Sequence, residues 1–295
     1  MDKVIIVGGG LGGLLLAILL ERASIDYVVL ECSPVAKMPL EGGGVISMTS
    51  QIQPLLQQLS ILPLLKDLTK PVSRVTVLEV LQGSGKQPTV CGVIDSAFSL
   101  SRMCWMLDEP LPEPQDSPDV EDLSRMQQDV QEMSYRYRAM PSPLKDTVLG
   151  DLFDLTPTGT MLSLPREEAS FSTWTHGKIA LMGDACHKAL PYGGQPMVQA
   201  GYDAASLANI LYAHSLDPSH HDLEAGLRSY EAARRAEAKH AVESSHQFGQ
   251  LLNRSGWIGK VLRYLVLNCI PQFLLHSLGD RLNHHRPQAS FLPQV

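Results

Sequence analysis

The sequence predicts an α/β protein with a Rossmann-like domain, a reduced β-rich segment in the middle and a helical C-terminal region. Three observations support this fold class. The apolar strand 4–7 runs into a glycine-rich turn, a second apolar strand, 178–182, ends in Gly183-Asp184, and helical patterns dominate beyond residue 197. A strand, a tight glycine turn and a helix in this order are typical of a nucleotide-binding β-α-β unit.

The glycine-rich turn has the spacing of a pyrophosphate-binding loop. Gly8, Gly10 and Gly13 follow the strand as G-x-G-x-x-G. The first glycine permits the tight turn, the second lets the backbone approach a pyrophosphate, and the third allows the helix to pack closely on the strand. The turn also contains Leu11, and the helix expected from about Gly12 would present unpaired N–H groups and its positive dipole end to the phosphates.

The second strand of this unit, 27–30, ends in Glu31. An acid at this distance from the glycines accepts hydrogen bonds from a ribose, so we expect the unit to bind an ADP group, of either FAD or a nicotinamide cofactor. Two alternatives compete with this interpretation. The run 4–20 has no charged residue and could be a targeting segment, and a glycine-rich turn can exist without a ligand. The density of glycine and the position of Glu31 disfavour both.

Composition excludes some classes of function. With 295 residues, 44% of them hydrophobic, the chain can bury a large core. Its formal net charge of −7 disfavours nucleic acid as a partner. The five cysteines are scattered and form no C-x-x-C pair: Cys32, Cys91, Cys104, Cys186 and Cys269. This pattern favours a reducing compartment and argues against a zinc site. We therefore expect a soluble cytoplasmic protein; the sequence does not indicate its oligomeric state.

Elements of the remaining chain follow from local patterns. The expected order is a loop at 42–44, helices over 50–59 and 63–68, strands over 72–80, 89–94 and 102–107, an acidic surface loop over 108–122, and helices over 120–137, 144–153, 197–213 and 223–252. The last segment, 257–278, mixes Lys260 and Arg263 with apolar residues and contains Pro271, which disfavours a membrane-spanning helix. We expect it to pack on the protein body, with peripheral membrane contact as the alternative.

The second motif carries a family resemblance. A strand ending in Gly183-Asp184, the loop Pro191-Tyr192-Gly193-Gly194-Gln195 and a helix bearing Asp203-Ala204 resemble the GD region of class A flavoprotein monooxygenases, the para-hydroxybenzoate hydroxylase-like group. The segment GDACHKALPYGGQPMVQAGYDAASLANIL is similar to that of fungal FAD-dependent oxidoreductases. The resemblance extends back to 105–110 and forward to the tail at 286–293, so it covers most of the chain.

This resemblance implies FAD as the cofactor. Asp184 would hydrogen-bond the ribityl chain, although aspartate also favours a helix N-cap. The next helix N-terminus would stabilise negative charge on the N1–C2=O edge of reduced flavin. The residues expected to face that edge are Pro191, Gly193, Gly194, Met197 and Val198. We expect Cys186, His187 and Asp203 to be structural.

Four features depart from the family pattern. The family carries, between the two motifs, a strand ending in Asp-Gly that serves FAD and NAD(P)H, but this sequence has no Asp-Gly dipeptide and no arginine between Arg22 and Arg74. Pro196 replaces a loop glycine and Val198 an asparagine, and proline is compatible with the first turn of a helix. The chain thus resembles a member with an internal deletion near 97–101, which would leave an unpaired sheet edge and an opened pocket.

These patterns predict an FAD-dependent oxidoreductase of the monooxygenase type. By resemblance, NAD(P)H is the co-substrate and an aromatic or secondary-metabolite molecule is hydroxylated; no catalytic acid or base is identified. One alternative is a non-catalytic remnant with weak or no FAD binding, and another is a nicotinamide-only dehydrogenase, which leaves the GD segment unexplained. The predicted domains are 1–72 with 175–215 for FAD binding, 73–174 for a reduced substrate domain, and 216–295 for the C-terminal helices.

Overall fold

The computed structural model describes residues 3–32, 51–68, 71–79, 89–100, 123–142, 146–156, 161, 168–190, 194–254, 256–270 and 286–295. Several predicted features lie outside these described residues. They are the loop at 42–44, the strand 102–107, the surface loop 108–122, and the positions Pro191, Gly193 and Pro271.

The N-terminal unit has the predicted β-α-β order. β1 (Val4–Val7) leads through the glycine turn into α1 (Leu11–Arg22), and β2 (Tyr27–Leu30) runs parallel to β1. Ile6 on β1 is buried against the apolar side of α1, where Leu19 and Leu20 are fully buried. Burial of one face of the strand pair is what fixes α1, and therefore the glycine turn, in place.

The other face of this strand pair is open to solvent. Ile5, Val7 and Leu30 have exposed fractions of 63%, 84% and 52%. Within the described ranges, β1 pairs with β2 and with no other strand. Among the described strands, β1 and β2 thus form a pair with one exposed apolar face, whereas apolar strand residues of a Rossmann-like sheet are normally covered on both faces.

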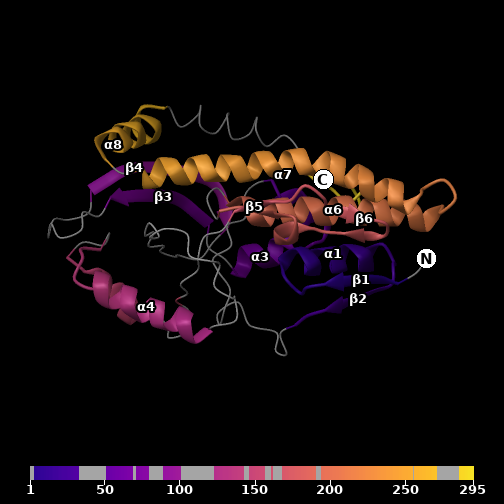
Figure 1. Ribbon diagram of the computed structural model, residues 1–295, viewed down its shortest axis with the longest axis horizontal. Helices are drawn as coiled ribbons and strands as arrows, with labels where there is room; N and C mark the ends of the chain where they lie inside the picture. The colour runs from indigo at the N-terminus through magenta and orange to yellow at the C-terminus, as the bar shows by residue number, and fades with distance from the viewer. Residues whose placement is uncertain are drawn as a thin grey trace.

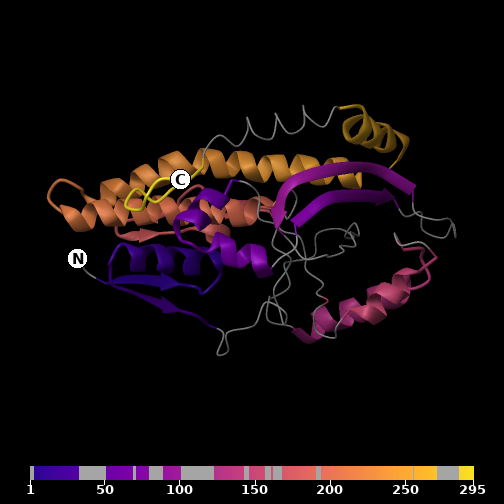
Figure 2. The ribbon, with the colours of Figure 1, turned by 180° about the vertical axis from the view of Figure 1, so that it is seen from behind.

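Two long helices lie on the opposite side of α1 from the strands (Figures 1 and 2). α6 (Gln195–Leu216) packs against α1, and α7 (Leu223–Asn253) packs along α6. Both helices were predicted; α6 begins two residues earlier than expected. α7 is capped by Asp222, whose carboxylate accepts from the N–H groups of Glu224 and Ala225.

The same core holds two short helices and the C-terminal tail. α2 (Gln53–Gln58) and α3 (Leu62–Leu68) correspond to the predicted helices over 50–59 and 63–68. Ala289 is fully buried, and its N–H donates to Gln58 Oε1 at 2.8 Å. The tail is thus fastened to α2, and the ring of Phe291 lies 4.8 Å from that of Tyr212 on α6.

The predicted GD strand is much shorter than expected. Only Ile179–Ala180 (β7) is a strand, and it forms an antiparallel hairpin with β6 (Thr175–His176). The prediction of a strand over 178–182 is thus confirmed for residues 179–180 alone, and the chain leaves the hairpin after Leu181. Leu181 N–H donates to the Trp174 carbonyl, and the Leu181 carbonyl accepts from the Tyr230 hydroxyl on α7 at 2.8 Å.

The chain after β7 turns sharply. Gly183–Ala185 forms the 3₁₀-helix η1, and β8 (His187–Lys188) then pairs antiparallel with β5 (Ala169–Ser170). Gly183 has a φ of +59°, a left-handed conformation that favours glycine.

The middle of the chain forms a hairpin and a small helical cluster. β3 (Pro71–Glu79) pairs antiparallel with β4 (Thr89–Leu100), which continues past the expected end at 94. α4 (Leu123–Tyr137) and α5 (Leu149–Leu155) form their own core around Tyr137 and Phe153. α5 begins later than the predicted residue 144 because Val148 bridges back to Pro141 and the Thr147 carbonyl accepts from Ser142 N–H.

After α7, the described residues 256–270 contain α8 (Gly256–Tyr264) and a π-helical turn, η3 (Leu265–Cys269). Among the helices described, none combines the length and the apolar character needed to cross a bilayer.

Candidate functional site

The glycine turn forms a cradle of N–H groups at the start of α1. Gly10 caps the helix in an extended conformation, and the first helical bond runs from Leu14 N–H to the Gly10 carbonyl at 2.9 Å. The N–H groups that precede this bond lack a helical partner: those of Gly10, Leu11, Gly12 and Gly13. The first turn contains no acidic residue, so nothing in it repels an anion.

A different physical reason explains why glycine stands at each of these positions of the motif. Gly8 has a φ of +108°, which other residues rarely adopt. A Cβ atom on Gly13 would lie 2.1 Å from the Gly8 carbonyl oxygen, so the turn and the helix touch there. A Cβ atom on Gly10 would meet nothing within 4 Å. The space over Gly10 is thus open to a ligand, whereas Gly13 is required for packing.

Glu31 lies beside this cradle. Its Oε2 accepts from the Gly9 N–H at 2.6 Å, and the neighbouring Gly8 N–H donates to the Leu30 carbonyl at 2.7 Å. The acid at the end of β2 therefore reaches the loop after β1, and its side chain is exposed. Glu31 therefore lies where the sequence predicted an acid that accepts hydrogen bonds from a ribose.

The two motifs meet at Gly12. A Cβ atom on Gly12 would lie 3.1 Å from Met182 Cε and 3.4 Å from Ala200 Cβ. Met182 directly precedes the GD pair, and Ala200 is in the second turn of α6. The N-terminus of α1, the GD turn and the N-terminal part of α6 are thus packed together, although they are far apart in the sequence.

Asp184 lies in the middle of η1 and is exposed. The residue that caps η1 is Met182, so the alternative that Asp184 is a helix N-cap is wrong. Within the described part of the chain, the Asp184 carboxylate makes no hydrogen bond, which leaves its oxygens accessible from solvent.

The N-terminus of α6 is a second open helix end. Gly194 caps it with a φ of +67° and no side-chain cap, and no acid lies in the first turn. Val198 is the fourth residue of the helix, so its N–H has the Gly194 carbonyl as its helical partner, and its side chain is fully buried. The N–H of Met197 precedes the first helical bond and remains without a helical partner.

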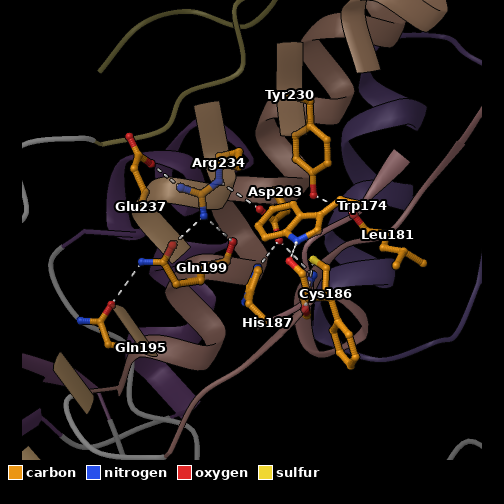
Figure 3. A network of polar contacts seen from close by, with 12 residues as sticks. Trp174, Leu181, Cys186, His187, Gln195, Gln199, Asp203, Tyr230, Arg234 and Glu237 are labelled. Carbon is orange, nitrogen blue, oxygen red and sulfur yellow. Dashed lines mark hydrogen bonds and ion pairs between the residues drawn. The ribbon is translucent and has the colours of Figure 1, made fainter. Parts of the chain in front are cut away.

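A buried carboxylate holds the GD turn from behind (Figure 3). Asp203 on α6 is fully buried, and its Oδ2 accepts from the Gly183 N–H at 2.9 Å and lies 2.6 Å from His187 Nε2. Its Oδ1 accepts from Arg234 Nε at 3.0 Å. An ionised carboxylate only accepts, so the proton shared with His187 lies on Nε2.

Arg234, on α7, is 3% exposed and completes this network. Its other nitrogens donate to Glu237 and to Gln199 Oε1, the latter at 2.6 Å (Figure 3). Sequence reasoning did not single out Arg234. A signal was present, because Arg234 follows Leu227 and Tyr230 at the spacing of the buried stripe of α7.

Cys186, His187 and Asp203 are all buried and bonded inside the protein, in keeping with the expectation that they are structural. The Trp174 ring lies 5.3 Å from His187 and 5.9 Å from Tyr230, so aromatic rings enclose the network. Burial raises the pKa of the Cys186 thiol and of the Tyr230 hydroxyl far above their ordinary values, which keeps both protonated. The three side chains converge within 4.8 Å, but the Asp203 oxygens are occupied by Gly183, His187 and Arg234, which disfavours a metal ion there.

Comparison with known proteins gives matches of three kinds. The family described as FAD binding domain matches residues 146–245, which include the GD turn, α6 and most of α7. FAD-dependent monooxygenase penM from Penicillium crustosum is 33% identical over 116 residues, which are 38% of this chain and 24% of that protein. FAD-dependent monooxygenase ptmM from Penicillium ochrochloron is 45% identical over 67 residues, 23% of this chain and 15% of that protein. Each alignment thus covers about a quarter or less of the relative.

Solved structures resemble the chain over almost its whole length. Klebsiella pneumoniae HpxO, in complex with FAD and uric acid, superposes with a TM-score of 0.66 at 15% identity and covers 97% of both chains. 2,6-Dihydroxypyridine-3-hydroxylase from Arthrobacter nicotinovorans gives a TM-score of 0.59 at 15% identity, over 86% of this chain and 93% of that one. At this identity the likeness shows a common fold.

Proposed function

We propose that the chain is a member of the class A FAD-dependent monooxygenase family, which it resembles, that it binds FAD, and that it acts as a flavin-dependent monooxygenase. The observation that carries the proposal is the contact between the two motifs at Gly12. That contact brings two helix N-termini without acidic residues, and the GD turn, to one place. Converging positive helix ends suit a cofactor that carries a pyrophosphate and becomes negative on reduction.

The adenine half of FAD is assigned to the N-terminal unit. The open space over Gly10 admits the pyrophosphate, and the N–H groups of Leu11, Gly12 and Gly13 would donate to it. Glu31 would accept from the ribose hydroxyls next to its bond with the Gly9 N–H. The donor set and the open space therefore fit this half of the cofactor.

The flavin half is assigned to the second motif. The exposed carboxylate of Asp184 would accept from the ribityl hydroxyls. The α6 N-terminus, with Gly194 and the Met197 N–H, would face the N1–C2=O edge together with Pro191 and Gly193. The buried N–H of Val198 would contribute through the helix dipole rather than by direct donation. Asp203 would act behind this surface by fixing the Gly183 N–H.

Bound FAD would supply the redox chemistry, in which NAD(P)H donates a hydride and dioxygen provides the inserted oxygen atom. The part of this chain is to bind the cofactor, orient it and stabilise negative charge at the α6 N-terminus. Cys186 and Tyr230, which lie behind the GD turn, are held protonated by burial and are therefore unsuited to act as general bases. The proposed substrate is a small aromatic or secondary-metabolite molecule, in keeping with the fungal monooxygenases that the chain resembles.

A non-catalytic FAD binder is the second candidate. The observation that favours it is the exposed apolar face of β1 and β2, with Ile5 and Val7 open to solvent. A sheet that lacks a covering layer is less rigid, and a monooxygenase must keep water from its flavin.

NAD(P)H-dependent oxygen uptake separates the two candidates. The chain saturated with FAD is mixed with NADH or NADPH, and oxygen consumption is followed with and without aromatic test compounds. The monooxygenase proposal predicts uptake that Gly10→Val abolishes, since valine would fill the space over Gly10 while its φ of −70° remains allowed. Bound flavin without oxidation of either nucleotide would refute the catalytic proposal and leave the FAD binder.

A further inference from the structure

α8 lies at the end of the molecule away from α1 and β1 (Figures 1 and 2), and it carries an exposed apolar stripe. Its residues have large exposed fractions: Trp257 75%, Ile258 45%, Val261 47% and Tyr264 61%, continued by Leu265 at 46%. At about 100° per residue, the four residues of the helix lie within an arc of roughly 120°. They therefore form one face, which we call the α8 face.

The opposite side of α8 is fixed to the end of α7. Gly259 is buried, and a Cβ atom there would lie 2.1 Å from the Arg254 carbonyl oxygen. Arg263 is 6% exposed and donates to the carbonyls of Leu252 at 3.2 Å and Arg254 at 2.6 Å. The apolar stripe thus cannot turn inward by rotation of α8 without breaking these bonds. Its exposure is a fixed property of the described structure.

Charge points to the kind of surface that would cover the α8 face. The chain has a formal net charge of −7, yet the sequence from residue 244 to residue 279 contains no acidic residue. The lysine and arginine residues of that stretch are the exposed Arg254 and Lys260, and Arg263, which is buried against α7. The apolar face is therefore part of a basic segment in an acidic protein, which suits an anionic surface.

Residues of the α8 face and its surroundings have the arrangement of an interfacial helix. Trp257 and Tyr264 lie at its two ends, and both residue types prefer the boundary between lipid and water. A cleft of about 640 Å³ lies beside it, lined by Gln247, Gln250, Leu251, Asn253, Arg254 and Leu262. Amide and guanidinium donors next to an apolar stripe fit phosphate-bearing lipid headgroups.

We propose that the α8 face docks the protein on an anionic phospholipid bilayer, with α8 lying in the plane of the interface. The helix has nine residues, and its apolar side chains would enter the headgroup boundary while Lys260 stays on the aqueous side. This inference does not depend on FAD binding or on monooxygenase activity. α8 packs on the protein body through Gly259 and Arg263, as expected, and its other side is the surface proposed for membrane contact.

Vesicle flotation and tryptophan fluorescence test the proposal on the full chain. Phosphatidylcholine vesicles with and without phosphatidylserine are the probes. We expect the protein to float with the phosphatidylserine vesicles, to shift its emission to the blue, and to be released by salt. In a Trp105→Phe background, Trp257→Phe should retain flotation but lose most of the shift, because the remaining Trp174 is 1% exposed and cannot report contact with lipid.

Matched variants distinguish docking through the α8 face from nonspecific adsorption of the protein to vesicles. Val261→Asp should lower the vesicle-bound fraction at least tenfold, whereas Leu216→Asp, which changes a residue 68% exposed on α6, should not. Lys260→Gln should lower affinity for the anionic vesicles roughly fivefold. Failure to float with either vesicle, or equal flotation of Val261→Asp and wild type, would overturn the proposal. A dimer in the absence of lipid that Val261→Asp dissociates would also overturn it, by assigning the α8 face to a second copy.

Discussion

Replacing Asp203 with alanine should strongly destabilise the fold, because it removes the acceptor on which three groups converge. Asp203 is fully buried and binds the Gly183 N–H, His187 and Arg234. Arg234 is itself 3% exposed, so the variant would leave a buried guanidinium with one of its two carboxylate partners missing. Breaking a buried ion pair from one side costs about 3–5 kcal/mol.

The Glu237 partner of Arg234 provides the matched control. The Glu237 side chain is 45% exposed, so its pair with Arg234 is screened by water. Glu237→Ala should therefore cost less than about 1 kcal/mol of unfolding free energy. Both variants remove a carboxylate from the same guanidinium, but Asp203 is buried and also binds the Gly183 N–H and His187.

Urea unfolding followed by far-ultraviolet circular dichroism measures both changes, from the midpoint and the slope of each transition. A double variant, Asp203→Ala with Arg234→Leu, should be less destabilised than Asp203→Ala alone, since the unpaired buried charge is then gone. A loss below about 1 kcal/mol for Asp203→Ala, or a double variant whose loss equals the sum of the two single losses, would refute the reasoning.

Three further predictions concern the glycine loop, the GD pair and pH. Gly13→Ala should destabilise the fold by about 1–3 kcal/mol, measured by thermal unfolding, because its Cβ would lie 2.1 Å from the Gly8 carbonyl oxygen; an unchanged Tm would contradict it. Asp184→Ala should weaken FAD binding by about 1.5–3 kcal/mol in a flavin titration while leaving stability unchanged, and the exposed Asp129→Ala on α4 is its control. The Thr175 hydroxyl, which donates to Glu231 at 2.7 Å, lowers the pKa of that carboxyl below 4.5. The stability that the ionised Glu231 carboxylate contributes is thus present at neutral pH and is lost as the pH falls through its folded-state pKa. The difference in unfolding free energy between wild type and Glu231→Gln should therefore vanish in acid. A difference that persists in acid would argue against the Thr175 bond as its source.

The N-terminal unit was predictable because its signals are local. The spacing of Gly8, Gly10 and Gly13 after an apolar strand fixed the β-α-β order, and the position of Glu31 followed from the end of the second strand. Helices α6 and α7 were predicted within a few residues, since long periodic patterns are reliable indicators.

The GD strand and the buried network were less predictable. The segment 178–182 is apolar, but the strand ends where the Leu181 carbonyl accepts from Tyr230, which is distant in sequence. Asp203 was expected to be structural, yet its pairing with Arg234 arises only when α6 and α7 pack together. The exposure of the α8 face could not be predicted either, because a pattern of apolar residues does not tell whether a neighbour covers them.

Titration of the purified chain with FAD, followed by the visible absorbance spectrum, tests the central claim most directly. The account predicts a saturable change with one FAD per chain and a resolved flavin spectrum, since the α1 and α6 N-termini and the GD turn are already packed together. Gly10→Val should show neither. A chain that remains colourless and indifferent to added FAD would contradict the account and identify the protein as a remnant of its family.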